Sequence, residues 1–424
     1  MELSDYQVAG VERMMEKDVY IQADVMGMGK TAQAIEYMKR TADKKFIVIC
    51  PASLKTNWQN EINNWLDINV EPDKYDGNIV ITNYERMARL MDDVDVSKFG
   101  GVICDEAHAL KNIDSHRTQV GRELIRRVGN PMLLTGTPIL NRPNDLLGLI
   151  YVGGKLSDFW NRSAFEYRYM RWVNPVTGVT FRQYNHLEEL RDKMQKYICR
   201  RTWHDLDMDV YTHWIDKIYI GKFSRYPLVS QSICDIEHVE RRITEYRIPL
   251  IIDWLQNYLE SNDEPVVIFA HHRKIIQELV DKLDGMCYNI GGMKIKERDK
   301  QINDFVSGNA RGIVCSINCS ATGLNFTNAH TIVFVEYPWN KSILNQAIAR
   351  CARRGQTHAT HVFFLCLQNS FDDYRLAQSE VKNIVAENVI DYGVHNLDTI
   401  LTPKEQYKIL MEQMREKFGD DFLQ

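Results

Sequence analysis

The stretch "IQADVMGMGKTAQAIEYM", residues 21–38, joins a short apolar run to a glycine-rich turn and then to a helical pattern. A glycine-rich turn between a strand and a helix is typical of a phosphate site, because backbone N–H groups at the helix N-terminus point at the anion. The P-loop pattern begins with a glycine, and this chain has Asp24 at that position. On this motif alone, a phosphate site is favoured over a purely structural strand-to-helix turn.

The residues of the turn have distinct expected roles if it holds a nucleotide. Lys30 reaches the β and γ oxygens, and the Thr31 hydroxyl binds Mg²⁺. The phosphates lie against the backbone of four residues, which are Met26, Gly27, Met28 and Gly29. The expected ligands are therefore ATP and Mg²⁺.

A second motif, "VICDEAHAL" (102–110), places two adjacent carboxylates at the end of an apolar run. We expect Asp105 to hold Mg²⁺ through water, and Glu106 to orient and deprotonate the attacking water. A lone DEAH sequence can arise by chance. One that follows a P-loop on a separate strand predicts a nucleoside triphosphatase.

Apolar runs of strand length alternate with helical patterns in both halves of the chain. They cover residues 19–24, 45–51, 78–84, 101–107 and 131–138 in the first half, and 265–272, 311–317, 331–338 and 360–367 in the second. Such runs predict α/β lobes with mostly parallel sheets flanked by helices, whose ligands gather at the carboxyl ends of the strands. We place the lobes at residues 1–221 and 222–424. Residues 145–260 lose the strand rhythm, which predicts a helical insertion at the end of lobe one.

The composition is typical of a soluble protein inside the cell. The chain has 424 residues, 44% of them hydrophobic and 26% charged, and no apolar run reaches the length of a membrane span. The N-terminus lacks a secretory signal, and the scattered cysteines fit reduced core thiols, Cys315 and Cys319 included. We expect a monomer without membrane contact, in the cytoplasm of a bacterial or virus-infected cell.

The charge distribution leaves a nucleic-acid surface open. A net charge of −5 argues against a uniformly basic nucleic-acid binder. Within it, Trp160–His204 carries nine Arg or Lys against four Asp or Glu. This stretch predicts either a local basic surface or an ordinary solvated helix face, and charge alone does not separate the two.

Several further motifs follow each other in a fixed order. They are "LSDYQVAGV" (3–11), "CPASLKTNWQNEI" (50–62), "ITNYERM" (81–87), "DEAHALKN" (105–112), "LTGTPILNRPNDL" (134–146), "LEELRDKMQKYICRR" (187–201), "VVIFAHH" (266–272), "SATGLNFTNAHTIVFVEYPWN" (320–340) and "QAIARCARRGQ" (346–356). With them, most of the chain resembles a superfamily-two helicase of the Swi/Snf branch, and most closely a compact fork-remodelling or annealing type. The resemblance implies two RecA-like lobes.

The resemblance also implies roles around the nucleotide. Gln7 corresponds to the base-reading glutamine, and Gln346 to a second nucleotide-binding position. Arg350 and Arg353 correspond to the arginines that contact the γ-phosphate. Residues expected to couple hydrolysis to movement are His108, Thr135, Thr137 and Gly323.

A DNA track is implied in the same way. A motor that follows a backbone needs phosphate contacts more than base contacts. The resemblance assigns such contacts to Lys55, Trp58, Thr82, Asn83, Lys111, Asn112, Arg142 and Asn325. Trp58 has an alternative reading, because Trp58 and Trp65 fit core positions of one helix.

The expected function is an ATP-dependent DNA translocase or helicase that moves on double-stranded or branched DNA. Fork remodelling, branch migration, annealing and unwinding all belong to this class. An RNA helicase is the main alternative, since the DEAH tetrapeptide alone fits it. A kinase leaves the second-half motifs unexplained, and an inactive ATPase disagrees with an intact Lys30, Glu106 and Arg353.

Overall fold

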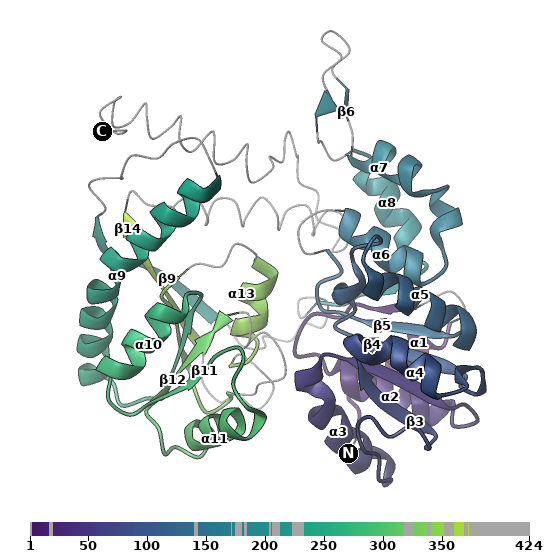
Figure 1. Cartoon of the computed structure of the whole chain (residues 1–424), viewed down its shortest axis with the longest axis horizontal. Coiled ribbons are helices and arrows are strands. Elements are labelled where there is room, and N and C mark those ends of the chain that lie inside the picture. Colours follow the sequence, from purple (N-terminus) through teal and green to yellow (C-terminus); the bar gives the residue numbers. More distant parts are fainter. Residues whose placement is uncertain are drawn as a thin grey trace. The chain divides into compact units, whose positions relative to one another are not determined.

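The computed structural model describes residues 2–16, 20–139, 143–170, 172–173, 180–181, 185–202, 205, 213–222, 233–317, 326–336, 341–351, 360–368 and 372. The described residues up to 205 form one compact unit, and those from 213 onward form a second. Each unit contains its own six-stranded sheet, and the two are treated separately below (Figure 1).

The sheet of the first unit is parallel throughout, in the order β3-β2-β4-β5-β1-β8. Its strands are β1 (Ile21–Gln22), β2 (Phe46–Cys50), β3 (Ile79–Asn83), β4 (Gly101–Asp105), β5 (Pro131–Leu134) and β8 (Ile198–Cys199). Because the strands are parallel, their carboxyl ends meet at one edge of the sheet. This edge receives the turns that carry the sequence motifs.

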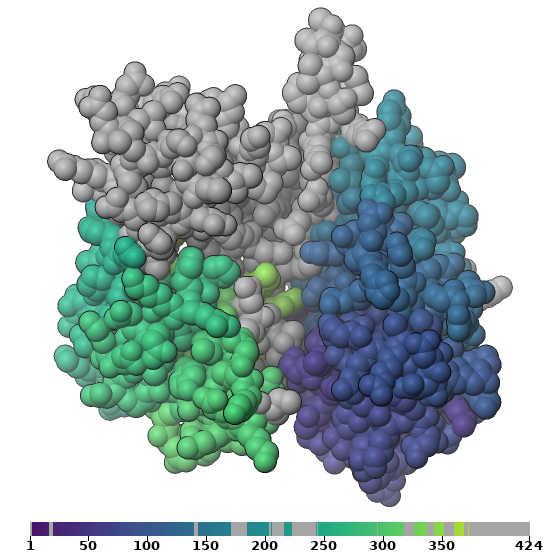
Figure 2. Space-filling model, in the orientation of Figure 1, coloured from purple at the N-terminus to yellow at the C-terminus, as the bar shows by residue number. Residues whose placement is uncertain are grey.

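Helices cover both faces of this sheet. They are α1 (Asp5–Met14), α2 (Lys30–Arg40), α3 (Lys55–Leu66), α4 (Met87–Asp93), α5 (His116–Val128), α6 (Asn144–Val152), α7 (Arg162–Met170) and α8 (Leu187–Met194), with short 3₁₀ turns η1 (Ala52–Leu54), η2 (Tyr84–Arg86), η3 (Val96–Lys98), η4 (Ala107–Leu110) and η5 (Leu156–Phe159). In the space-filling view, the teal part with α7 and α8 forms one surface with the blue part of this unit (Figure 2).

Alternate residues of each strand enter two different cores, as the period of two along a strand requires. Phe46 and Val48 of β2 pack with α1, α2 and α3 on one face. Ile47 and Ile49 pack with α4 to α8 on the other. Burial of each such side chain contributes about 1.5–3 kcal/mol, so both helical layers hold the sheet firmly.

The second unit repeats this plan with a parallel sheet in the order β11-β12-β10-β13-β14-β9. The strands are β9 (His213–Lys222), β10 (Val266–Ala270), β11 (Met286–Asn289), β12 (Gly312–Ser316), β13 (Thr331–Phe334) and β14 (Thr360–Gln368), and the helices are α9 (Ile233–Ser261), α10 (Arg273–Lys282), α11 (Ile295–Val306) and α13 (Lys341–Ile348). Val267 and Phe269 of β10 pack with α11 and α13, whereas Val266 and Ile268 pack with α9 and α10.

The fold prediction is confirmed, since every predicted apolar run contains a strand and both sheets are parallel. Two details differ. Edge strands β9 and β11 and the short β8 were not predicted, and β6 (Trp172–Val173) pairs with β7 (Thr180–Phe181) inside the predicted helical insertion. β9, which ends at the proposed boundary at residue 222, hydrogen-bonds to β14 and so belongs to the second sheet.

No helix in the described ranges is long and apolar enough to cross a membrane. The cysteines in the part of the chain that the structure describes are free and buried, as expected of core thiols, and Cys315 is one of them. Cys319 lies outside the described residues.

Candidate functional site

The glycine-rich turn connects β1 to α2, which begins at Lys30. Gly27 and Gly29 have φ values of 85° and 74°, in the left-handed region that favours glycine. A Cβ on Gly29 would lie 2.3 Å from Nε2 of Gln7, so a larger residue is also excluded by space. The Gln7 side chain, from α1, donates to the Met28 carbonyl oxygen over 3.2 Å. Gln7 and the turn therefore form one local structure.

Asp24, the residue in place of the first P-loop glycine, lies at the centre of a buried polar network. Its carboxylate accepts hydrogen bonds from Gln22 (2.9 Å) and Gln33 (3.1 Å) and is fully buried. Arg201, which follows β8, donates to both carboxylate oxygens, over 3.1 Å from Nε and more closely from Nη2. The network holds the start of the turn to α2 and to the end of the first unit.

Arg200 extends this connection to a second turn. Its guanidinium donates to the Ala23 carbonyl oxygen (2.6 Å) and to the Gly136 carbonyl oxygen (3.0 Å). Gly136 lies between Thr135 and Thr137, whose backbone N–H donates to the Thr135 hydroxyl. Arg200 thus joins the start of the glycine-rich turn and the Thr-Gly-Thr turn at the same sheet edge.

Lys30 folds back over its own turn. Its ammonium donates to the carbonyl oxygens of Asp24 (2.7 Å) and Val25 (3.3 Å). Burial lowers the pKa of Lys30, although the carboxylates of Glu106, Asp24 and Asp105 act in the opposite direction. This half-buried ammonium is a compact positive charge that can exchange the two carbonyl oxygens for an incoming anion.

The two adjacent acids occupy the end of β4. Asp105 is its last residue, and Glu106 has a φ of 50°, which turns the chain and separates the two side chains. The Trp58 indole donates to Asp105 Oδ2 over 2.8 Å, and the Tyr84 hydroxyl donates to the Asp105 backbone oxygen over 2.6 Å. Glu106 Oε2 lies 3.3 Å from His108 Nδ1. The Trp58 hydrogen bond fixes the orientation of the Asp105 carboxylate, and His108 is the neighbour of Glu106.

The electrostatics of this pair fit a divalent cation. Burial, together with the neighbouring Glu106, raises the pKa of Asp105 to about 6. A buried carboxylate whose charged form is disfavoured gains stability from a nearby cation. Oxygen ligands such as the Asp105 carboxylate and the Thr31 hydroxyl, at the start of α2, are the type that Mg²⁺ prefers. These residues could hold Mg²⁺.

Comparison with known families agrees with this geometry. Residues 6–221 match the family described as the SNF2-related domain, and residues 250–355 match the helicase conserved C-terminal domain. The chain belongs to the SNF2-related family.

Three curated proteins illustrate the relationship. The chain is 30% identical over 88% of its length to the SWI/SNF-related matrix-associated actin-dependent regulator of chromatin subfamily A-like protein 1 homolog of Caenorhabditis elegans, and 27% identical over 99% to the Bos taurus protein of that name. It is 23% identical over 92% to the DNA annealing helicase and endonuclease ZRANB3 of Mus musculus. The match covers 59%, 49% and 40% of these relatives, respectively. These animal relatives give no support to the expected bacterial or viral source.

The predicted DNA contacts of this SNF2-related chain lie at or near the carboxyl edge of the first sheet. Lys55 opens α3, and Thr82 and Asn83 end β3. Lys111 and Asn112 follow η4. Three of these side chains have acidic partners, since Lys55 and Thr82 contact Asp73 and Asn83 donates to Glu85.

Trp58 differs from its prediction as a DNA contact. Its side chain is fully buried in the core between α3 and the sheet, and its indole N–H is directed at Asp105. A side chain without exposed surface cannot contact a DNA backbone in this arrangement. Trp58 instead positions the Asp105 carboxylate.

The second unit contains fewer of the predicted residues. Gln346 is buried in α13, and Arg350 lies just after that helix, also buried. The predicted residues outside the described part are Arg142, Gly323, Asn325 and Arg353.

The basic stretch at residues 160–204 is largely neutralised where the structure describes it. Arg162 pairs with Asp114, and Arg168 pairs with Glu189. Lys196 lies 3.4 Å from Asp158. The solvated-face interpretation therefore describes these side chains better than a free basic surface.

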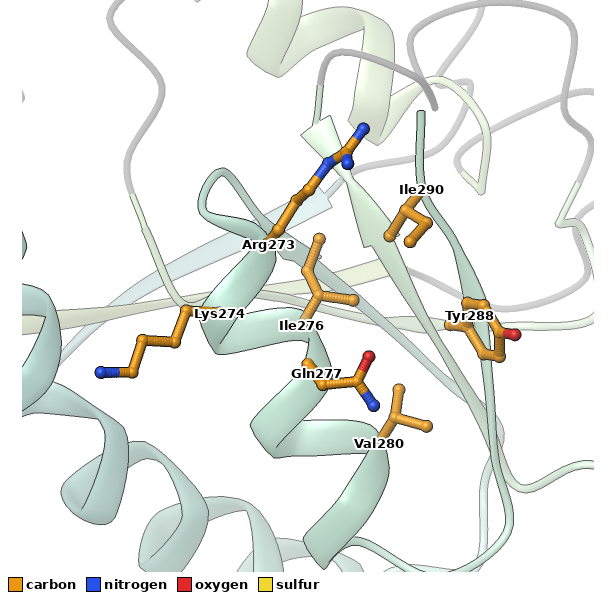
Figure 3. Close-up of a pocket in the computed structure, with 7 residues that line it drawn as sticks. All are labelled: Arg273, Lys274, Ile276, Gln277, Val280, Tyr288 and Ile290. Carbon is orange, nitrogen blue, oxygen red and sulfur yellow. The ribbon is translucent and has the colours of Figure 1, made fainter. Parts of the chain in front are cut away.

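A hollow of about 460 Å³ lies between α10 and β11 of the second unit (Figure 3). Arg273 on its rim donates to the Gly291 carbonyl oxygen, and Lys274 points away from Tyr288 and Ile290 toward Glu245. Both cations have protein partners, so the hollow supports no assignment as an anion site.

Proposed function

We propose that this chain is an ATP-dependent DNA translocase that moves on double-stranded or branched DNA. The observation that carries the proposal is the group formed by Lys30, Asp105 and Glu106 at one sheet edge, with Gln7 packed on the glycine-rich turn. A lysine over a P-loop beside one buried and one half-buried acid is the arrangement that nucleoside triphosphate hydrolysis requires.

The proposed roles follow from the positions of the side chains. Lys30 leaves the carbonyl oxygens of its own turn and binds the β and γ phosphates, while Gln7 reads the adenine. Thr31 and Asp105 hold Mg²⁺, which neutralises developing charge on the phosphates. Glu106 accepts the proton of the attacking water. His108 lies 3.3 Å from Glu106, and Gly136, between Thr135 and Thr137, lies beside Lys30, so we assign these three residues to relaying the change toward the proposed DNA contacts.

DNA is the proposed track because the relatives' names indicate it. One is named a DNA annealing helicase, and two are named regulators of chromatin. Fork remodelling, branch migration and annealing are the proposed outcomes of movement along DNA. An RNA helicase is the competing class.

We expect ATP hydrolysis to rise strongly with duplex or four-way-junction DNA and to change little with RNA. The physical reason is that we expect the two lobes to close productively around the nucleotide only when DNA is bound. Steady-state hydrolysis should be measured with no nucleic acid, single-stranded DNA, duplex DNA, a four-way junction and RNA, with Glu106→Gln as the background control. Equal stimulation by RNA would favour the RNA-helicase class instead.

We also expect DNA affinity to fall steeply with salt and to vary little with base sequence, since the contacts are with phosphates. Lys55→Ala should weaken binding and reduce the salt slope by about one, with ATP binding intact. Lys45→Ala is the matched control, because this exposed lysine precedes β2 at the opposite edge of the sheet. A flat salt dependence would contradict a phosphate-based track.

A further inference from the structure

The Asp73 carboxylate is contacted by donors from three separate elements of the first unit. Lys55 Nζ, at the start of α3, donates to Asp73 Oδ2 over 2.5 Å. Arg86 Nη1, at the end of η2, lies 2.8 Å from the same oxygen, and the Thr82 hydroxyl of β3 donates to Oδ1 over 2.9 Å. Two cations and a hydroxyl around one anion form an anion-binding site that Asp73 fills.

Asp73 reaches this position on an irregular segment. Residues 67–78 between α3 and β3 contain no helix or strand. Asp73 has a φ of 60°, an uncommon conformation for a residue with a side chain, and its N–H donates to the Ile81 carbonyl oxygen over 2.8 Å. Asp73 thus holds the middle of the segment against the sheet edge, while Val70 donates its N–H to Asn63 Oδ1 and Tyr75 packs against the core.

The burial of Thr82 indicates that the Asp73 carboxylate competes with a DNA phosphate for this site and does not help to bind it. Thr82 has no exposed surface, and its hydroxyl is directed at Asp73. A DNA phosphate can reach this hydroxyl only after Asp73 moves away. The exchange preserves charge, because a backbone phosphodiester carries the same single negative charge as the carboxylate. Although burial acts in the opposite direction, hydrogen bonds from Lys55 and Thr82 hold the pKa of Asp73 below its ordinary value, so the group that fills the site is a charged carboxylate.

We propose that Lys55, Thr82 and Arg86 form one site for a backbone phosphodiester of the tracked strand, and that the Asp73 carboxylate fills it until DNA displaces it. The proposal rests on the proposed function, because it assumes that Lys55 and Thr82 face DNA. It adds Arg86 as a phosphate contact and makes Asp73 a residue that lowers DNA affinity. The Asp73 segment then controls access to part of the track.

The decisive variant is Asp73→Asn, which removes the charge and keeps the size of the side chain. Binding of fluorescently labelled duplex DNA to the full chain without nucleotide should tighten at least about fivefold. The slope of log affinity against log salt should steepen by about one. In this variant no displaced carboxylate is left to bind a salt cation when DNA binds. Asp76→Asn is the matched control, because Asp76 is exposed on the same segment and should change affinity much less.

Arg86→Ala should weaken DNA binding, and the gain from Asp73→Asn should shrink in the double variant, because both residues act at one phosphate. Arg89→Ala, an exposed arginine of the next helix, is its control. Hydrogen exchange of the unmodified chain gives a test that needs no variant. On addition of duplex DNA, amides of residues 67–78 should exchange faster while those of α3 are protected.

The outcomes separate this inference from the function on which it rests. DNA affinity of Asp73→Asn equal to or below that of the parent, or slower exchange at residues 67–78 with DNA, would overturn the competing role of Asp73. If Lys55→Ala left DNA affinity unchanged, the proposed DNA track itself would fail. Weakening by Lys55→Ala and Arg86→Ala together with tightening by Asp73→Asn would support both.

Discussion

Glu106→Gln should bind ATP with near-parent affinity and hydrolyse it at least about a hundredfold more slowly. The amide keeps the shape of the side chain but cannot accept a proton from water. Glu106 is well placed for this role, because it follows β4 directly and its left-handed backbone directs it away from Asp105. Single-turnover hydrolysis and fluorescent-nucleotide binding, both with saturating duplex DNA, separate chemistry from affinity.

The control for this change is Glu123→Gln. Glu123 lies on the exposed face of α5, where it pairs with Arg126 and Arg127, so the same substitution there should leave hydrolysis unchanged. Hydrolysis by the Glu106→Gln chain at close to the parent rate would remove Glu106 from the proposed role of general base. The fold and the position of Asp105 would be unaffected by that result.

The strands and the motif turns could be predicted because their signal is local. A buried parallel strand needs a continuous apolar run, as in "FIVIC" of β2, and residues just after such a run lie at the carboxyl edge. Glu106 and Lys30 were found in this way. Edge strands such as β11, "MCYN", are only half buried and carry mixed side chains, so they lack that signal.

Contacts between distant parts of the chain could not be predicted from a pattern. Trp58 has the spacing of both a core residue and a DNA contact, and only the position of Asp105 in space decides between them. Arg201 ends the motif "LEELRDKMQKYICRR", but its partner Asp24 lies 177 residues earlier. Asp73 carried no motif at all, and its role depends on three elements that fold around it.

Arg201→Met should lower the free energy of unfolding of the first unit by about 3–5 kcal/mol, because it leaves the Asp24 charge buried without its cation. Gln22 and Gln33 continue to donate to Asp24 but carry no charge. Hydrogen exchange at the amides of Ile21 and Leu133 measures the free energy of unfolding of this unit, since both amides hydrogen-bond across the sheet beside the network. Arg162→Met is the control, because its pair with Asp114 is exposed and screened by water and should contribute little to stability.

The double variant Arg201→Met with Asp24→Asn should be more stable than Arg201→Met alone. Asparagine at position 24 still accepts hydrogen bonds from the two glutamines, and no buried charge remains without a partner. The loss from the two changes together should therefore be smaller than the sum of the single losses. If the losses simply added, or if Arg201→Met were as stable as the parent, the buried pair would not hold the glycine-rich turn to the end of the first unit. Because the same turn carries Lys30 and the backbone proposed to face the phosphates, a loosened Asp24 should also reduce ATP affinity in Arg201→Met, and the double variant should restore part of it.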